Sequence, residues 1–223
     1  MLKVEFHCHT LYSKDSLLNP QALLETCRRK GIDRVIITEH NNIAGAQHAQ
    51  ALDPQRVIIG EEIMTRCGEL LAAFVSEEIP SGLAPQEAIA RLRGQGAFIS
   101  VSHPFDLLRS GHWEEPDLLA ITPLVDAIET FNARCMRSSF NQQAQDFARQ
   151  HNLAGTVGSD AHTARELGRA CLLLPDFQDA EGLRQVVRQG QPQVILSSPL
   201  IHLTSRYAVW RKKHNGAGKH TDV

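Results

Sequence analysis

The sequence predicts an α/β fold in which a single domain forms a closed or nearly closed β/α barrel. Short apolar runs alternate along the chain with stretches of helical periodicity, a pattern typical of parallel strands joined by helical crossovers. The chain has 223 residues, of which 42% are hydrophobic, so it can bury a core large enough for one barrel. Charged residues make up 22%, an ordinary share for a globular protein, which excludes general disorder.

Eight apolar runs are expected to form the strands of this barrel. Gly68 and Glu69 precede one of them and could turn the preceding strand back on itself as a local hairpin. The expected strands cover residues 2–9, 34–38, 56–60, 70–75, 97–102, 125–131, 154–158 and 193–196.

Four amphipathic stretches are expected to form helices. The first has the clearest boundaries, because Asn19 stands at the N-cap, Pro20 at the first helical position and Gly31 just past the end. Near the C-terminus the sequence turns basic and loses its periodicity, so we expect a barrel domain over 1–203 and a flexible tail over 204–223. The expected helices cover residues 20–30, 85–94, 138–151 and 180–189.

Charge, hydropathy and cysteine content argue against several classes of protein. Lys and Arg number 23 against 25 Asp and Glu, and the net charge of −2 argues against a broad nucleic-acid surface. No apolar run approaches the roughly 20 residues that span a bilayer. The chain starts directly with strand-like sequence rather than a signal peptide, and its five cysteines form no C-x-x-C pair. The expected location is the cytoplasm, without membrane association.

Histidine is abundant, with 11 in the chain, and two of them form an H-x-H motif in the first expected strand. Successive side chains of a strand point to opposite faces, so His7 and His9 project side by side from one face. Cys8 lies on the other, apolar face and is expected to be structural. Two adjacent imidazoles suit two ligands of one metal ion, although the motif alone is weak evidence.

The signal strengthens because five further apolar runs end in a histidine, aspartate or glutamate. The carboxyl ends of the strands of a parallel barrel form the rim where active sites are built. Imidazoles mixed with carboxylates favour Zn, Mn or Fe over Ca, and so many ligands exceed the capacity of one ion. The sequence therefore predicts two or three divalent metal ions. The residues are Glu39 and His40, Glu61 and Glu62, His103, Glu129, and Asp160 with His162.

Together these residues resemble the PHP (polymerase and histidinol phosphatase) family of metal-dependent phosphoesterases. The resemblance covers nearly the whole chain. It implies a distorted (β/α)7 TIM-like barrel and a centre of two or three divalent ions that hydrolyses phosphate esters. The motifs that carry it are His7-Cys8-His9-Thr10, Tyr12-Ser13-Lys14-Asp15-Ser16, Thr38-Glu39-His40-Asn41, Gly60-Glu61-Glu62, Ser102-His103-Pro104 and Gly158-Ser159-Asp160-Ala161-His162.

Carried over position by position, the resemblance implies three groups of metal ligands. Glu62 occupies the ligand position of the family's G-x-E motif and would bridge two ions, whereas its neighbour Glu61 is expected to point elsewhere. The groups are His7, His9, Glu62 and Asp160 for one ion, Asp15, His40 and His162 for another, and His103 for the remaining one.

Two positions depart from the family pattern. Glu39 stands where aspartate is usual and is expected to orient His40 from behind. Some three-metal members carry a histidine after the segment of Glu129, and residues 130–136 contain none. The third ion is therefore expected to be weakly held, differently ligated or absent. Cys135 could replace the histidine, although a buried structural cysteine is the better interpretation.

The expected reaction is attack on phosphorus by a hydroxide that bridges the metal ions, with Asp160, His162 and Glu62 as the catalytic residues. Phosphate oxygens also require cationic donors, for which arginine has suitable bidentate geometry. The candidates on the rim are Arg134 foremost, then Arg165, Lys14 and Arg109, each of which could instead be a surface charge.

The expected substrate is a small phosphomonoester or a nucleotide-type phosphate, because the spacers between the motifs leave little room for a second domain. His112 and Trp113 could pack against a base or sugar, or simply anchor their loop. Three alternatives stay open: a histidinol-phosphatase-like enzyme, a metal-dependent amidohydrolase, which would normally carry a bridging lysine, and a non-catalytic metal-binding module.

Overall fold

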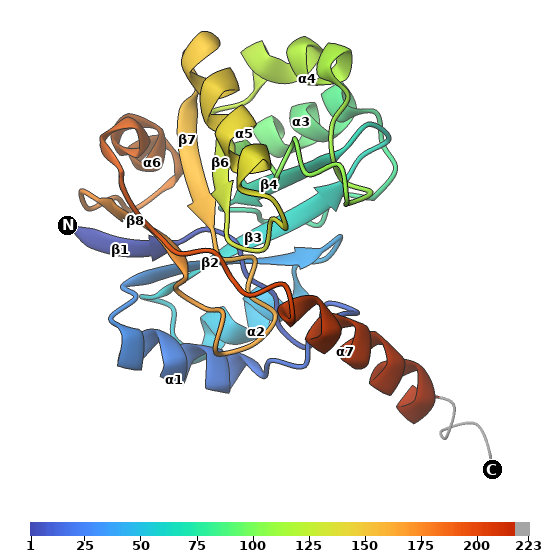
Figure 1. Cartoon of the computed structure of the whole chain (residues 1–223). Helices are drawn as coiled ribbons and strands as arrows, with labels where there is room; N and C mark the ends of the chain where they lie inside the picture. Colours follow the sequence, from blue (N-terminus) through green and yellow to red (C-terminus); the bar gives the residue numbers. More distant parts are fainter. Residues whose placement is uncertain (217–223) are drawn as a thin grey trace.

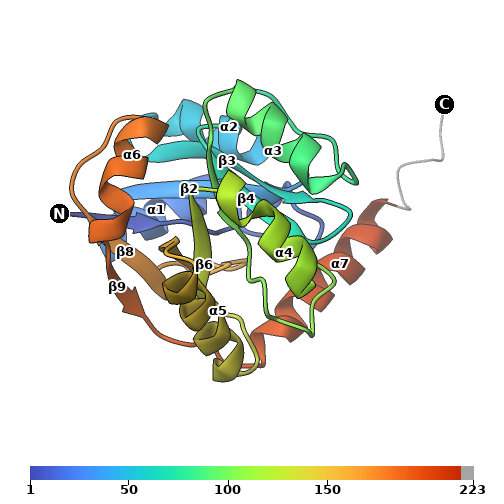
Figure 2. The same cartoon turned by 90° about the horizontal axis from the view of Figure 1, so that it is seen from above.

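In the computed structural model, which describes residues 1–216, the sheet curls into a nearly closed barrel with helices around it (Figures 1 and 2). Within those residues nine strands form one sheet in the order β7-β6-β5-β4-β3-β2-β1-β8-β9. The predicted α/β barrel is therefore confirmed. The strands are β1 (Leu2–Glu5), β2 (Arg34–His40), β3 (Val57–Met64), β4 (Glu69–Ala73), β5 (Phe98–Val101), β6 (Ala127–Asn132), β7 (Ala154–Gly158), β8 (Ala170–Leu174) and β9 (Gln191–Val194).

Helices cover the outside of the barrel. The first begins and ends as predicted, because the Asn19 side chain accepts a hydrogen bond from the backbone N–H of Gln21 at 2.8 Å, and Gly31 follows the helix in the left-handed region. The helices are α1 (Pro20–Lys30), α2 (Ala44–Leu52), α3 (Pro85–Gly94), α4 (Glu115–Ile121), α5 (Ser138–Gln150), α6 (Ala180–Val186) and α7 (Ile201–Gly216), with 3-10 turns η1 (Thr122–Leu124) and η2 (Val187–Gln189).

Two strands, β4 and β8, run against the direction of both their neighbours, and β4 lies between two groups of parallel strands. β1, β2 and β3 pair in parallel, as do β5, β6 and β7, but β4 is antiparallel to both β3 and β5. The hairpin predicted at Gly68 and Glu69 is confirmed. Because β4 runs backwards, its first residue, Glu69, lies at the rim where its neighbours have their carboxyl ends.

The barrel closes through the segments that follow β1 and β7. Cys8 and Ala161 form a parallel bridge, and the backbone N–H of His9 donates to the carbonyl oxygen of Ala161 at 2.8 Å. Further back, β8 pairs antiparallel with β1 and β9 pairs antiparallel with β8. The bridge fixes the spacing between two segments that carry candidate ligands.

Three elements of the barrel, β8, α2 and α4, have no counterpart among the predicted ones. The run that forms β8 is apolar throughout, so it lacks the alternation that marks a half-exposed strand. α2 consists mainly of alanine and glutamine and offers little contrast between its faces. The strand expected at 193–196 lies two residues earlier, as β9.

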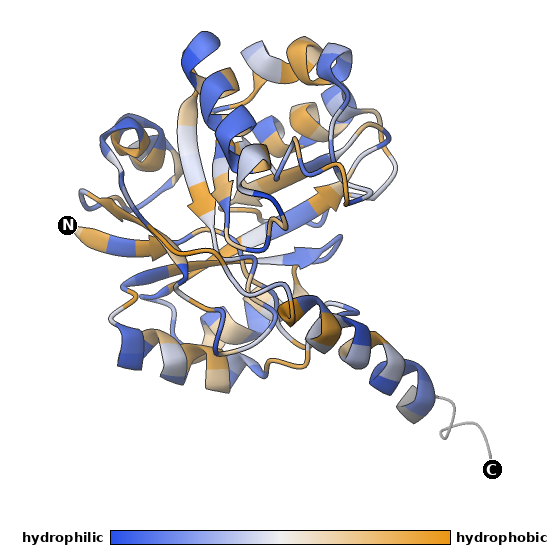
Figure 3. Cartoon of the chain, viewed as in Figure 1, coloured by the Kyte–Doolittle hydropathy of each residue, from blue (hydrophilic) through white to orange (hydrophobic). Residues whose placement is uncertain are grey.

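The C-terminal residues differ most from expectation. Residues 204–216 belong to α7 instead of a flexible tail, and 217–223 lie outside the described part of the chain. Ala208 is buried against the barrel, whereas Tyr207 and Trp210 are each 54% exposed. α7 leads away from the barrel (Figure 1) and mixes hydrophobic with hydrophilic residues along its length (Figure 3), which explains why no periodicity marked it as a helix.

Large apolar side chains fill the space inside the strands. Val4, Phe6, Ile36 and Phe98 are all buried and belong to one cluster, and further clusters lie between the sheet and the helices. Among the described residues, no helix is both long enough and apolar enough to cross a membrane.

A charged cluster ties elements together at the end of the barrel away from the rim. Asp126, which precedes β6, accepts hydrogen bonds from Arg93 at 2.7 Å and Arg184 at 3.2 Å. Its carboxylate also accepts from the backbone N–H of Ile99 at 2.8 Å. These bonds join α3 and α6 to the starts of β5 and β6.

Replacing this carboxylate should destabilise the fold without changing the rim. Asp126→Ala removes the carboxylate shared by two guanidinium groups and the acceptor of the Ile99 N–H, and the free energy of unfolding should fall by about 2 kcal/mol. Urea denaturation of the metal-free protein measures the change. Glu87→Ala, which breaks a surface ion pair with Arg91, is the control and should cost about 0.5 kcal/mol or less. Equal effects of the two changes would contradict the assignment.

Candidate metal centre

The structure brings all the predicted ligands to one rim of the barrel. His7 and His9 follow β1, His40 ends β2, Glu62 lies in β3, and His103 follows β5. Most of these side chains are buried, while those of Asp15 and His40 are partly exposed and open the site to solvent. The remaining two, Asp160 and His162, follow β7.

The first predicted group converges on a single point. Nε2 of His7 lies 3.2 Å from Nε2 of His9. Glu62 oxygens lie 3.3 Å from His7 and 3.4 Å from His9, and Asp160 Oδ1 lies 3.7 Å and 3.4 Å from the same nitrogens. Four atoms held tetrahedrally about 2.0–2.2 Å from one ion lie about 3.3–3.6 Å apart, so these side chains could hold a divalent ion.

The second predicted group lies on the other side of His9. Asp15 Oδ2 is 3.1 Å from Nε2 of His162 and 3.4 Å from Nε2 of His40. The rings of His40 and His162 each lie 4.3 Å from that of His9, centroid to centroid. Nitrogens of the three histidines lie within 4.8 Å of one another, close enough to share an ion.

Around His103 the structure shows a carboxylate that the sequence did not predict. Nε2 of His103 lies 3.2 Å from Glu62 and 3.5 Å from Oε2 of Glu69. His40, Glu62 and Glu69 also form one of the clusters of candidate ligands. Cys135, in contrast, is buried beside Asp106 and belongs to none of these clusters among the described residues. Glu69 rather than Cys135 therefore stands where a further ligand would be needed.

A carboxylate behind His7 fixes how its ring is turned. Nδ1 of His7 lies 3.0 Å from Oε1 of Glu129. The other oxygen of Glu129 accepts from the backbone N–H of His103 at 2.9 Å and from Asn132 at 3.1 Å. A proton on Nδ1 leaves the lone pair of Nε2 directed at Glu62 and Asp160, as metal-binding histidines require.

The expectation that Glu39 orients the ring of His40 is wrong, because Glu39 acts through Ser13 instead. It accepts hydrogen bonds from the hydroxyl of Ser13 and from the backbone N–H of Thr10 at 3.0 Å. The Ser13 oxygen lies 3.2 Å from Nδ1 of His9 and accepts from the backbone N–H of His40 at 3.1 Å. Glu39 thus supports the His9 ring and the His40 backbone. Glu61 points elsewhere, as predicted, and accepts from the N–H of Ile79.

The pKa shifts follow from the crowding of opposite charges. Burial alone would raise the pKa of Glu62, but His7 and His40 outweigh it and hold that pKa well below its usual range. Burial, together with His162 and His40, lowers the pKa of His9 to about 3, so this ring is neutral. For His7, burial opposes the charge, yet Glu62 and Asp160 raise its pKa well above the ordinary value.

The donor set fits divalent cations. Imidazole and carboxylate are ligands that Zn, Mn and Fe accept. Nε2 of His162, which faces Asp15, is buried without a hydrogen-bond partner among the described residues. The nitrogens of His7 and His9 face each other across 3.2 Å without a carboxylate between them. Cations bound by these nitrogens would satisfy their lone pairs.

The predicted phosphate-binding residues fall into two sets. Arg134 is buried, with one guanidinium nitrogen 2.5 Å from Nδ1 of His162 and another 3.2 Å from Glu166. Arg109 forms an ion pair with Asp160. Lys14 and Arg165 are exposed, and in the described part of the chain no hydrogen bond or ion pair of their side chains joins them to the cluster.

The aromatic side chain near the rim anchors its loop. Trp113 is buried, and its indole N–H donates to the carbonyl oxygen of Glu69 at 3.0 Å. His112 lies with Nδ1 2.6 Å from the carbonyl oxygen of Arg109. Of the two interpretations given for this pair, loop anchoring is the one that the contacts support, since a buried indole cannot stack on a base.

Close backbone packing allows the segments after β1 and β7 to meet. A Cβ atom on Gly158 would lie 2.4 Å from Cβ of His7 and 2.4 Å from Oε1 of Glu129, so only glycine fits. Two residues on, Asp160 adopts a left-handed backbone with φ 50°, uncommon for a non-glycine residue. Together these positions direct the Asp160 carboxylate at the rim.

The fold and the site define a metal-binding β/α barrel with a mixed histidine and carboxylate centre. The PHP domain model matches residues 5–92, and the PHP-associated model matches residues 138–192. A protein of Methanocaldococcus jannaschii with no characterized function is 39% identical over 173 residues, which are 76% of this chain and 69% of that protein. The chain belongs to the PHP family.

Solved structures of more distant proteins share the fold. A two-domain Bacteroides vulgatus protein containing a predicted PHP-like metal-dependent phosphoesterase is 20% identical with a TM-score of 0.69, and the match covers 86% of this chain but only 64% of that one. A lesion-specific endonuclease from Pyrococcus furiosus is 15% identical with a TM-score of 0.56, over 89% of this chain and 59% of the other. At these identities the likeness concerns the fold.

Adding a side chain at position 158 should disturb the candidate centre. Gly158→Ala forces apart His7 and Glu129, and the affinity for Mn²⁺ or Zn²⁺ should fall about ten- to hundredfold, as when a residue behind a ligand is lost. Competition with a chelating indicator measures it. Gly94→Ala is the control, because a Cβ there meets nothing within 4 Å. Unchanged affinity in Gly158→Ala would refute the packing argument.

Metal binding should weaken as the pH falls. His7 and His40 have raised pKa values, the latter because Glu62 and Asp15 outweigh burial, so both hold protons near neutrality in the metal-free protein. An incoming ion must displace those protons. Titration calorimetry between pH 8 and pH 6, in two buffers of different ionisation enthalpy, should show lower affinity at the lower pH together with proton release. Affinity independent of pH would contradict these protonation states.

Proposed function

We propose that this protein is a metal-dependent phosphoesterase that hydrolyses a small phosphomonoester or a nucleotide-type phosphate. The observation that carries the proposal is the convergence of Glu62, Asp160 and five histidine rings on one rim of the barrel. Membership of the PHP family supports it. Two or three divalent ions held there would polarise the phosphoryl oxygens and activate water near neutral pH.

Glu62 is the residue best placed to bridge two ions. Its Oε1 faces His7 and His103, and its Oε2 faces His9 and His40. Ser102 donates to Oε1 at 2.8 Å and keeps the carboxylate plane in place. We therefore assign Glu62 a central role, because both oxygens face the first group of ligands while Oε1 also faces His103 and Oε2 also faces His40.

Asp160 and His162 are proposed to act beside the reacting phosphate. Asp160 Oδ1 faces the His7 and His9 nitrogens while Oδ2 is paired with Arg109, which holds the carboxylate charged and oriented. Nδ1 of His162 lies 2.8 Å from the backbone carbonyl oxygen of Asp160. The same Nδ1 lies within hydrogen-bond distance of Arg134, whose guanidinium can only donate, and Nε2 faces Asp15 at 3.1 Å.

The cations next to Asp160 are proposed to attract the phosphate. Arg134 is buried and Arg109 is partly buried at the centre, so phosphate oxygens would meet their charges in a site where electrostatic attraction is strong. Lys14 and Arg165 are exposed cations near the rim, and we propose that they contact a bound substrate from the solvent side.

Adjacent glutamates offer a matched test of this proposal. Metal-stripped protein reloaded with Mn²⁺ or Zn²⁺ should release phosphate from a panel of phosphomonoesters and nucleotides. Glu62→Gln should lower turnover by more than about a hundredfold, since losing even a residue behind a ligand costs 10- to 100-fold. Glu61→Gln, in the neighbouring buried position that points away, should keep the wild-type rate.

The outcomes separate catalysis from metal storage. No turnover of any ester by protein that binds ions stoichiometrically would overturn the proposal in favour of a non-catalytic metal-binding module. Equal loss of activity in the Glu61 and Glu62 variants would show that the effect comes from the strand rather than from the carboxylate at the centre.

A further inference from the structure

A cavity of about 310 Å³ opens directly beside the candidate centre. It lies between α7 and the segments that follow β1 and β7. Asp15 and His162, two of the predicted ligands, form its inner end, so the cavity and the centre are continuous. Its other walls include Leu17, Leu18, Tyr207 and Ala208.

The chemistry of the walls differs from that of the centre. Leu18 and Ala208 are buried beneath the cavity, while Leu17 and Tyr207 leave much of their surface open to it and to solvent. Among the described residues that line the cavity there is no lysine or arginine. These walls offer no cationic side chain to a phosphate, whereas burying an apolar or aromatic group against them would be favourable because the group leaves water.

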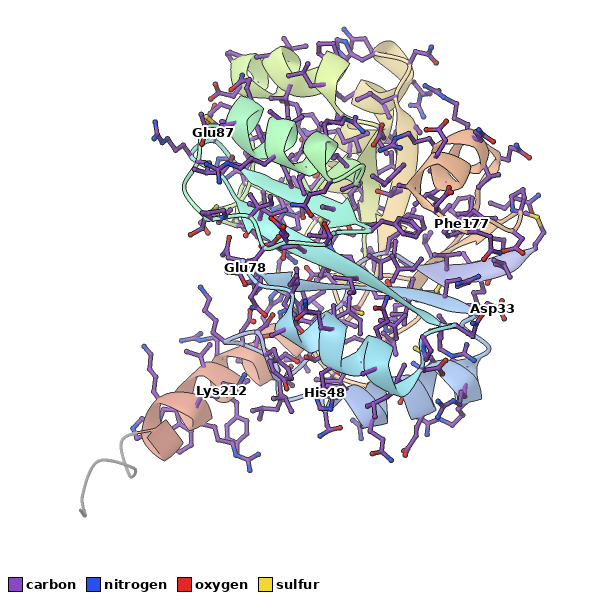
Figure 4. All side chains as sticks on the ribbon, turned by 180° about the vertical axis from the view of Figure 1, so that it is seen from behind. Asp33, His48, Glu78, Glu87, Phe177 and Lys212 are labelled. Carbon is purple, nitrogen blue, oxygen red and sulfur yellow. The ribbon has the colours of Figure 1, made fainter. Side chains whose placement is uncertain are left out.

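α7 is tied to the same loop that carries the ligands. The ammonium of Lys212, which is labelled in Figure 4, donates to the carbonyl oxygens of Leu11, at 2.6 Å, and Ser13. Near the start of the helix, Arg134 donates to the hydroxyl of Ser205 at 2.8 Å. Because both anchors also border the centre, the wall that Tyr207 forms has a fixed position relative to Asp15 and His162.

We propose that this cavity receives the leaving group of the ester and that it selects a neutral alcohol with an aromatic or bulky apolar body. The inference rests on the proposed phosphoesterase function. Water oxygen bonds to phosphorus, and the bond from phosphorus to the alcohol oxygen breaks. One water proton passes to the alcohol and the other leaves with the phosphate. The freed alcohol exits past Tyr207, the specificity-determining residue.

Two esters with leaving groups of similar basicity test the selection. Benzyl phosphate should have a lower KM than glycerol 1-phosphate for the metal-loaded protein. Tyr207→Ala should raise the KM for benzyl phosphate about three- to tenfold, the range expected for one aromatic contact, and change that for glycerol 1-phosphate less than about twofold. Leu17→Ala, on the wall formed by the segment after β1, should also raise the KM for benzyl phosphate more than the KM for glycerol 1-phosphate.

A matched control and a binding measurement separate the two proposals. Leu203→Ala removes an exposed side chain from α7 outside the cavity and should leave the KM for both esters unchanged. If both esters are hydrolysed but Tyr207→Ala affects them equally, the leaving-group site is overturned while the phosphoesterase stands. If neither is hydrolysed, calorimetry with benzylphosphonate and methylphosphonate decides. If benzylphosphonate binds more tightly than methylphosphonate and Tyr207→Ala abolishes the difference, the leaving-group site is supported. If the two compounds bind equally, the leaving-group site is overturned.

Discussion

The carboxylate of Glu62 contacts ring nitrogens of histidines in the segment after β1, in β2 and in the segment after β5. The order of the rim follows from the need to keep this buried charge satisfied. A carboxylate removed from water is unfavourable by several kcal/mol unless donors or cations surround it. Histidines lie 3.0–3.4 Å from its two oxygens. Behind the rings come further carboxylates, Glu129 directly and Glu39 through Ser13. Hydrogen-bond contacts therefore extend from the centre through the histidine rings into the barrel wall, and each layer depends on the next.

Much of the centre could be predicted from the sequence because a parallel barrel collects the carboxyl ends of its strands on one rim. His40, His103 and Asp160 each come directly after a buried run, so their meeting follows from the topology alone. The period of two in an extended chain placed His7 beside His9. The same rules gave the boundaries of α1, where asparagine, proline and glycine mark both ends through local chemistry.

Other parts could not be predicted, because they depend on direction and packing rather than on local pattern. Glu69 reaches the rim at the start of β4, which only its antiparallel direction explains. β8 is uniformly apolar, so no alternation distinguished it from a buried helical segment. Whether an arginine is buried also depends on tertiary contacts: Arg134 is enclosed by Glu166 and α7, whereas Arg165 remains exposed.

The antiparallel hairpin of β3 and β4 makes one part of the centre separable from the rest. Pairing of Met64 with Glu69 sets which face of the sheet Glu69 presents, and a shift of one residue in a strand turns every side chain to the opposite face. An insertion or deletion in the four-residue turn at 65–68 would thus remove Glu69 from His103 while leaving the ligands on the parallel strands in place. The length of this turn therefore determines whether the His103 side of the rim carries a second carboxylate.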